Sequence, residues 1–222
     1  MIGLTKIDGL SWNEIKHYVT ILPNKTEKEK IMQQLQEQDR CLGIVGKLLL
    51  LHALKKKKGW EKNFLPEFSY NEFKKPSFKD VSLGSFNISH SGNKVACFFS
   101  SENKRIGVDI EKIQEIEIND FRTVLTSKEY TLLRNRKAED FFQLWTKKEA
   151  LVKAIGMGFH FDPKKIEIEK HCIEDNFEMR LGTDSWHVHT FRNLKGYVLS
   201  AASPGGRVPA FEYVEKESLF LM

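Results

Sequence analysis

The sequence predicts an α+β protein in which a long helix is followed by a small antiparallel sheet, first in one half of the chain and then again in the other. Apolar residues recur at helical spacing over residues 26–56, and a second helical pattern covers residues 138–155. Short apolar stretches separated by turn residues follow each of them, which is typical of strands joined by tight turns. This repeated order suggests two similar α+β units, which we place at residues 1–112 and 113–222.

The first half is expected to contain one long helix and a meander of strands. A strand is predicted at residues 2–7, and a capping box at residues 11–14 starts a short helix. The long helix is expected to end at the lysine run of residues 55–58, whose charge suits the C-terminus of a helix dipole. Three strands joined by short turns follow, over residues 86–90, 94–100 and 106–112. Consecutive strands joined in this way usually pair, which places His90 and Asp109 in one sheet.

The second half is expected to contain a capping box, a long helix and a second sheet. The capping box lies at residues 126–129, and Gly156 with Gly158 ends the long helix. Strands are predicted after this helix, over residues 166–168, 186–191, 197–202 and 209–214.

The composition is typical of a globular protein from a reducing compartment. The chain has 222 residues, 41% of them hydrophobic, which is enough for a substantial core. Its three cysteines show no close pairing, which argues against a disulfide framework and a zinc motif. The apolar runs are too short for a bilayer and the N-terminus lacks a secretory pattern, so we expect a cytoplasmic protein. The net charge of +5 favours anionic partners.

The stretch IGVDIEK, residues 106–112, places two carboxylates on one face of a strand. Alternation turns the apolar residues to one side and Asp109 and Glu111 to the other, about 7 Å apart at ~3.3 Å per residue. A solvated sheet edge is the simplest interpretation of such a pair. The alternative is a site for Mg²⁺, a cation that prefers oxygen ligands.

The second helix adds another carboxylate and two lysines. Phe141, Trp145 and Lys148 share one stripe of this helix, and Glu149 lies one turn after Trp145 and one turn before Lys153. The i, i+4 pairing of Glu149 with Lys153 explains both residues, at roughly 0.3–0.5 kcal/mol on an exposed helix. Alternatively, Glu149 is a third ligand beside Asp109 and Glu111, and Lys148 and Lys153 face the phosphates that complete the coordination of Mg²⁺.

The stretch FNISHSG, residues 86–92, ends a predicted strand at a turn. Adjacent strand residues point in opposite directions, so Ser89 and His90 do not form a nucleophile–base pair. His90 is either a structural hydrogen-bonding residue or a phosphate contact beside the turn. We interpret His187 and His189, which share a strand face without a third ligand nearby, as structural.

Taken together, FNISHSG, IGVDIEK and LWTKKEALVKAIGMG resemble the Sfp-type 4′-phosphopantetheinyl transferases in order and spacing. The pattern of that family is a Ser-His turn, a G-[IV]-D-[IVL]-E strand and a W-[ST]-x-K-E-[AS]-x-x-K helix. The resemblance covers residues 75–158. It implies a pseudo-dimer of two α+β halves with the active site at their interface.

The resemblance also implies an activity. An enzyme of this kind, a holo-[acyl-carrier-protein] synthase type transferase, moves the 4′-phosphopantetheine arm of coenzyme A to a serine of an acyl or peptidyl carrier protein and releases adenosine 3′,5′-bisphosphate. Such carriers serve fatty acid, polyketide or nonribosomal peptide synthesis, and they are acidic, which suits a net charge of +5. We expect a monomer that uses Mg²⁺ and binds neither nucleic acid nor membrane.

Roles for individual residues follow from the same resemblance. It implies Mg²⁺ ligands at Asp109, Glu111 and Glu149. It implies contacts to coenzyme A from Lys75, Ser89, His90, Asp109, Lys148, Lys153 and Arg40. Transfer also needs a base for the serine proton, and Glu149, Glu129 and Glu111 acting through a metal-bound water all stay open. Lys153 is expected to neutralise phosphate oxygens during catalysis.

The alternative function is a non-catalytic basic module that binds acidic or phosphorylated partners, nucleic acid among them. It rests on the net charge and on the lysine run of residues 55–58. Three converging carboxylates argue against it, because they repel phosphate unless a cation lies between.

Overall fold

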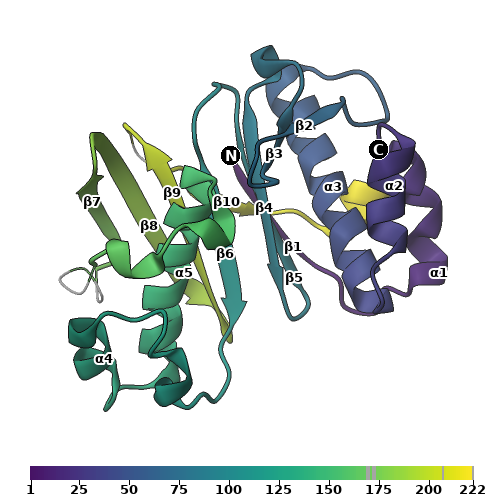
Figure 1. Cartoon of the computed structure of the whole chain (residues 1–222). Coiled ribbons are helices and arrows are strands. Elements are labelled where there is room, and N and C mark those ends of the chain that lie inside the picture. The colour runs from purple at the N-terminus through teal and green to yellow at the C-terminus, as the bar shows by residue number, and fades with distance from the viewer. Residues whose placement is uncertain (169–170, 172–173, 207, 222) are drawn as a thin grey trace. The chain divides into compact units, whose positions relative to one another are not determined.

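The elements of the chain group into two compact units (Figure 1). The computed structural model describes residues 1–168, 171, 174–206 and 208–221. Unit 1 comprises Met1–Asn71, Pro76–Lys104 and Pro209–Met222, and unit 2 comprises Glu72–Lys75 and Arg105–Val208. We predicted a boundary after residue 112. The contacts instead group residues 105–112 with unit 2 and the C-terminal segment with unit 1.

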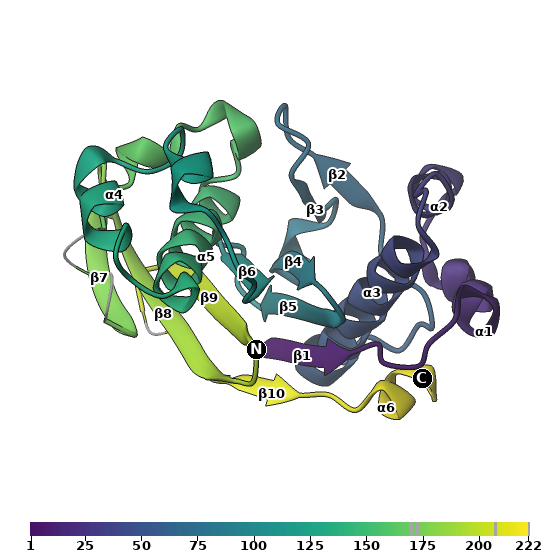
Figure 2. The ribbon, with the colours of Figure 1, turned by 90° about the horizontal axis from the view of Figure 1, so that it is seen from below.

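Unit 1 packs helices on a four-stranded sheet in the order β10-β1-β5-β4. Its described helices are α1 (Trp12–Ile15), α2 (Lys25–Met32), α3 (Glu37–Lys58) and α6 (Lys216–Phe220), with 3₁₀ turns η1 (Lys16–Ile21) and η2 (Val81–Leu83). Its strands are β1 (Ile2–Lys6), β4 (Ser85–Ser91), β5 (Lys94–Ser100) and β10 (Phe211–Tyr213), together with the separate hairpin of β2 (Phe68–Tyr70) and β3 (Pro76–Phe78). Strand β10 runs parallel to β1 at the edge of the sheet (Figure 2), so the C-terminal segment completes this unit.

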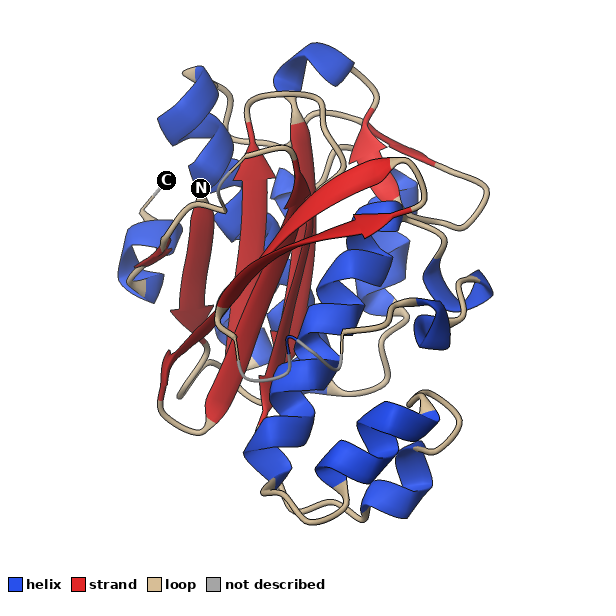
Figure 3. Cartoon of the chain, turned by 90° about the vertical axis from the view of Figure 1, so that its left-hand side faces the viewer, coloured by secondary structure: helices blue, strands red, loops and turns tan. Residues whose placement is uncertain are grey.

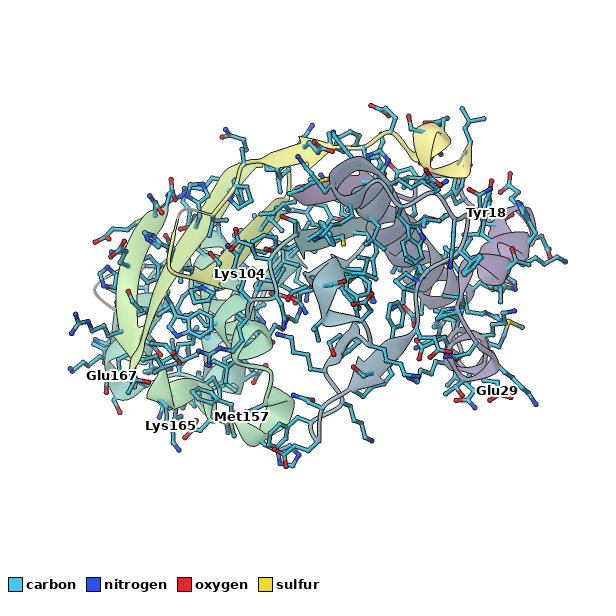
Figure 4. The ribbon with its side chains drawn as sticks, turned by 90° about the horizontal axis from the view of Figure 1, so that it is seen from above. Tyr18, Glu29, Lys104, Met157, Lys165 and Glu167 are labelled. Atoms are coloured by element: carbon cyan, nitrogen blue, oxygen red, sulfur yellow. The ribbon has the colours of Figure 1, made fainter. Side chains whose placement is uncertain are left out.

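The C-terminal segment is also fixed to unit 1 by side chains. The hydroxyl of Tyr18, labelled in Figure 4, donates to the backbone oxygen of Phe220 at 2.7 Å, and the two rings stack at 5.2 Å. Leu219 is fully buried in the core of the unit. These contacts explain why a segment so distant in sequence belongs to unit 1.

Unit 2 packs helix α5 on an antiparallel sheet in the order β6-β9-β8-β7. Its described helices are α4 (Ser127–Leu133) and α5 (Ala138–Ile155), with 3₁₀ turns η3 (Ile118–Phe121), η4 (Gly158–His160) and η5 (Pro163–Lys165). Its strands are β6 (Gly107–Lys112), β7 (Asn176–Leu181), β8 (Asp184–Leu194) and β9 (Tyr197–Pro204). Each unit thus sets a long helix against a four-stranded sheet (Figure 3), which confirms the predicted α+β class.

Three predicted elements differ from the structure. The helical pattern of residues 26–56 forms two helices, α2 and α3, instead of one. Ile31 of α2 packs against α3 at the place where a side chain at Gly43 would lie. Strand β6 pairs with β9 rather than with β5, so His90 and Asp109 lie in different sheets. The apolar residues of 166–168 follow η5 and enter the core of unit 2 without forming a strand.

The predicted local signals are confirmed at the helix starts. Capping boxes begin α1 and α4, at Ser11 with Glu14 and at Thr126 with Glu129. Helix α5 ends at Gly156, which adopts a left-handed conformation with φ of 86°. Within the described residues, helices long and apolar enough to cross a membrane are absent.

Candidate active site in unit 2

Strand β6 carries the most deeply buried of the three predicted metal ligands. Asp109 is only 2% exposed, whereas Glu111, two residues later, is half-buried. Gly107 explains how the strand comes so close to α5, because a Cβ atom there would lie 2.0 Å from the backbone oxygen of Ala150. The glycine of the predicted motif is therefore required by packing, and it brings Asp109 next to the last turns of the helix.

Lys153 and Asp109 form an ion pair between helix and strand. The distance from Lys153 Nζ to Asp109 Oδ1 is 2.6 Å, and the side chain of Lys153 remains 29% exposed. A lysine that pairs with a buried carboxylate while reaching solvent is able to interact with an incoming anion. We had considered Lys153 as the i, i+4 partner of Glu149; the structure shows it on Asp109.

Glu149 lies within electrostatic range of both carboxylates of β6. Burial, followed by the negative charge of Asp109, raises the pKa of Glu149 to about 7; Lys153 opposes this shift and Glu111 adds to it. Three carboxylates from one strand and one helix therefore influence one another. We call Asp109, Glu111, Glu149 and Lys153 the carboxylate–lysine site. Its repulsion is relieved when a proton or a cation binds.

The donor atoms of this site suit Mg²⁺. All three acidic residues offer oxygen ligands, and the repulsion among them favours a bound cation. Among the residues that the structure describes, no group of three His, Cys, Asp or Glu side chains is placed so that all three could hold a metal ion. Mg²⁺ commonly takes only one or two carboxylates and completes its octahedron with waters and substrate phosphates, so the residues fit this ion.

Lys148 and Glu129 form a second ion pair, which lies in the interior of unit 2. Their charged atoms are 2.6 Å apart, and both side chains are 0% exposed. Glu129 also accepts from the backbone N–H of Thr126 at the start of α4, and Lys148 donates to the backbone oxygen of Pro163. We expected Lys148 to face phosphates and considered Glu129 as a base. In the structure the pair joins α4, α5 and η5.

Lys75 is anchored on backbone oxygens of unit 2. Its Nζ donates to Ile106 at 3.2 Å and to Ala154 at 3.1 Å, so it satisfies a carbonyl in the last turn of α5. Burial, assisted by the charge of Arg105, lowers the pKa of Lys75 to about 8. The ammonium group therefore fixes residues 72–75 to this unit.

The remaining predicted contacts to coenzyme A belong to unit 1. Ser89 is buried on β4 and His90 is exposed beside it. Arg40, in the first turns of α3, lies with its guanidinium carbon 5.4 Å from the ring centre of Trp12. Its Nε is buried and lacks a hydrogen-bond partner among the described residues.

Sequence reasoning missed the buried hydroxyl groups that connect α5 to its sheet. Thr146 on α5 contacts Ser200 on β9, which in turn contacts Thr190 on β8. Thr146 stands at the [ST] position of the helix motif, which was the one available signal. Ser200 and Thr190 lie in stretches without a motif.

Comparison with known proteins identifies the family of the chain. The family model described as the 4′-phosphopantetheinyl transferase superfamily matches residues 105–202, which include the whole carboxylate–lysine site. The 4′-phosphopantetheinyl transferase gsp of Aneurinibacillus migulanus is 34% identical over 200 residues, which cover 86% of this chain and 82% of that protein. The 4′-phosphopantetheinyl transferase Sfp of Bacillus subtilis (strain 168) is 29% identical over 73% of this chain and 72% of its own length. The 4′-phosphopantetheinyl transferase AcpT of Salmonella typhimurium is 33% identical over 57% of this chain and 64% of its own length.

Proposed function

The chain belongs to the 4′-phosphopantetheinyl transferase superfamily, and from this premise we propose that it transfers the phosphopantetheine arm of coenzyme A to a serine of an acyl or peptidyl carrier protein. The observation that carries the proposal is the carboxylate–lysine site, in which a lysine and three carboxylates gather within the matched segment. Phosphoryl transfer depends chiefly on charge neutralisation and positioning, which such a cluster supplies.

In the proposed reaction the serine oxygen bonds to the phosphorus that carries pantetheine, and the bond from that phosphorus to the bridging oxygen breaks. Adenosine 3′,5′-bisphosphate leaves with the bridging oxygen, and the serine proton passes to a base. Asp109, Glu111 and Glu149 would hold Mg²⁺, which would neutralise the negative charge of the pyrophosphate. Lys153 would exchange part of its contact with Asp109 for a phosphate oxygen, because its side chain already reaches solvent.

Among the three candidate bases for the serine proton, Glu149 and Glu111 of the carboxylate–lysine site are favoured over Glu129. Glu129 is fully buried and paired with Lys148, which leaves it remote from a serine arriving from solvent. Without a bound cation, the pKa of Glu149 is about 7; Mg²⁺ would lower this pKa and keep the carboxylate ionised, so Glu149 or Glu111 would accept the serine proton directly or through a metal-bound water. We assign Lys148 and Glu129 an architectural role instead, because their pair supports the helix that carries Glu149.

The basic module that we considered as an alternative receives little support from the lysine run. Lys56 pairs with Glu212 at 2.9 Å, Lys55 donates to Asn63 and Lys58 donates to the backbone oxygen of Ser82. Much of the positive charge of the run is therefore engaged within unit 1. The positive net charge instead suits encounter with an acidic carrier protein.

The test is direct transfer. The purified protein is incubated with coenzyme A, Mg²⁺ and an apo carrier protein, and the carrier should gain the mass of one phosphopantetheine group. Asp109→Ala should abolish this gain, whereas Asp120→Ala, which changes an exposed aspartate of the same unit, should retain it. Circular dichroism verifies that both variants fold. Unchanged carrier mass across several acyl and peptidyl carriers with the folded protein would refute the proposal.

A further inference from the structure

Three buried hydroxyl groups join α5 to the sheet of unit 2 next to Asp109. Ser200 Oγ lies 2.8 Å from Thr146 Oγ1 and 2.9 Å from Thr190 Oγ1. All three residues are at most 2% exposed. We call Thr146, Ser200 and Thr190 the hydroxyl chain.

The direction of its hydrogen bonds follows from the acceptor at one end. Thr146 donates to the backbone oxygen of Gln143 at 3.4 Å. This hydrogen bond is long, but among the described residues this oxygen is the acceptor for Thr146 at this end of the chain. Ser200 then donates to Thr146, and Thr190 donates to Ser200. Every hydroxyl in the chain has an acceptor for its proton in this arrangement, and Ser200 connects the helix to β8 through two hydrogen bonds.

The hydroxyl chain adjoins the site from both elements. On the sheet, Ser200 lies directly opposite Asp109 on one side and Thr190 on the other, so these three side chains form one row on one face. On the helix, Thr146 precedes Glu149 by three residues and Lys153 by seven, a spacing that keeps them on one face. The chain therefore fixes the helix one turn before Glu149 and the sheet next to Asp109.

Hydroxyl groups at this position serve alignment better than they serve stability. Burying them is favourable only while they are paired, and apolar residues of the same shape would stabilise the interface about equally well. A hydrogen bond, however, requires a distance within a few tenths of an ångström, whereas an apolar contact tolerates sliding. The close approach of Gly107 to Ala150 accounts for how closely the helix packs on the sheet.

We propose that the hydroxyl chain is a positioning element that sets the register of α5 on its sheet. In that register Lys153 reaches Asp109 and Glu149 lies beside both carboxylates of β6. The structural part of this inference concerns unit 2 alone, and its kinetic consequence rests on the proposed transferase function.

The structural part is tested by a double-mutant cycle that does not require activity. Asp109→Asn and Lys153→Met are combined, and the coupling between them is measured by urea unfolding in the natural background and in the Ser200→Ala background. We expect the coupling to fall to less than half in Ser200→Ala, because the helix loses its register. In Ser203→Ala, a variant of another buried serine on the same strand that lies outside the hydroxyl chain, the coupling should be unchanged. Equal coupling in the natural and Ser200→Ala backgrounds would overturn the proposal.

The kinetic part compares a substitution that removes the hydroxyl group of Thr146 with one that keeps it. Thr146→Val removes the hydroxyl and keeps the shape, and it should lower kcat on the order of tenfold while the KM for coenzyme A changes little. Thr146→Ser keeps the hydroxyl and should restore most of kcat. Equal kcat in the two variants would contradict the positioning role. If the natural chain transfers nothing to any carrier, the proposed function fails, and the coupling measurement still decides the role of the hydroxyl chain.

Discussion

Glu149→Gln should make the protein more stable near pH 8 while it removes a residue of the proposed active site. In the folded chain, burial and the charge of Asp109 raise the pKa of Glu149 from its ordinary value of 4.5 to about 7. A tenfold change in proton affinity corresponds to about 1.4 kcal/mol, so ionisation of this carboxylate lowers the free energy of unfolding by about 3.4 kcal/mol at most. Because Glu149 is only half-buried, solvent screening reduces the expected gain on substitution to about 1–2 kcal/mol.

The gain should depend on pH in one direction. Below pH 4.5 the carboxyl group is protonated in both the folded and the unfolded chain, so it contributes no penalty. Between pH 4.5 and about 7 the unfolded chain loses the proton and the folded chain keeps it, so stability declines as pH rises. Above this window the penalty is complete. The glutamine side chain is neutral at every pH in this range, so the variant does not carry the penalty.

Urea unfolding in the presence of a chelator measures this difference near pH 8 and near pH 4. The control is Glu139→Gln, which neutralises an exposed glutamate on the same helix and should change the free energy of unfolding by less than about 0.5 kcal/mol. The reasoning is refuted if Glu149→Gln is no more stable than the natural chain near pH 8, or if the gain is equal at both pH values.

The effect of Mg²⁺ on the free energy of unfolding is a second measurement on the same variants. At a concentration ten times the dissociation constant, Mg²⁺ should raise the free energy of unfolding of the natural chain by about 1.4 kcal/mol. Glu149→Gln should gain less, since it lacks one of the proposed oxygen ligands. Equal stabilisation of both proteins would exclude Glu149 from the ligand set.

Three further substitutions test the packing around the site and the closure of unit 1. Gly107→Ala should lower the free energy of unfolding by at least about 2 kcal/mol in urea unfolding, because the added Cβ would lie 2.0 Å from the backbone oxygen of Ala150. Lys148→Met should lower the free energy of unfolding by about 3–5 kcal/mol, because Glu129 stays buried without its partner. The double variant Lys148→Met with Glu129→Leu should recover much of this loss in the same assay, and no recovery would contradict the pairing. Leu219→Ala should cost about 2–4 kcal/mol, and an unchanged thermal midpoint would show that the C-terminal segment adds little to unit 1.

Local signals in the sequence predicted the elements that form the site. The alternation of β6, the capping box of α4 and the glycine that ends α5 all act within a few residues, and each is present in the structure. Pairings between distant segments were not predictable in the same way. Strand β6 pairs with β9, which follows it by about ninety residues, and the preceding strand β5 lies in the other sheet. The packing of α2 on α3 is likewise a contact between separate elements, in which Ile31 lies against Gly43.

Two lysine–carboxylate pairs on α5 show why burial decides a role that residue type leaves open. Lys148 with Glu129 and Lys153 with Asp109 have the same separation of 2.6 Å. In the first pair both side chains are 0% exposed, so exchange with a ligand from solvent would require part of unit 2 to open. In the second pair the lysine is 29% exposed, and its ammonium group is able to turn from the carboxylate to a phosphate without leaving the helix surface. One lysine therefore supports the architecture and the other serves the proposed chemistry, although the sequence places them only five residues apart.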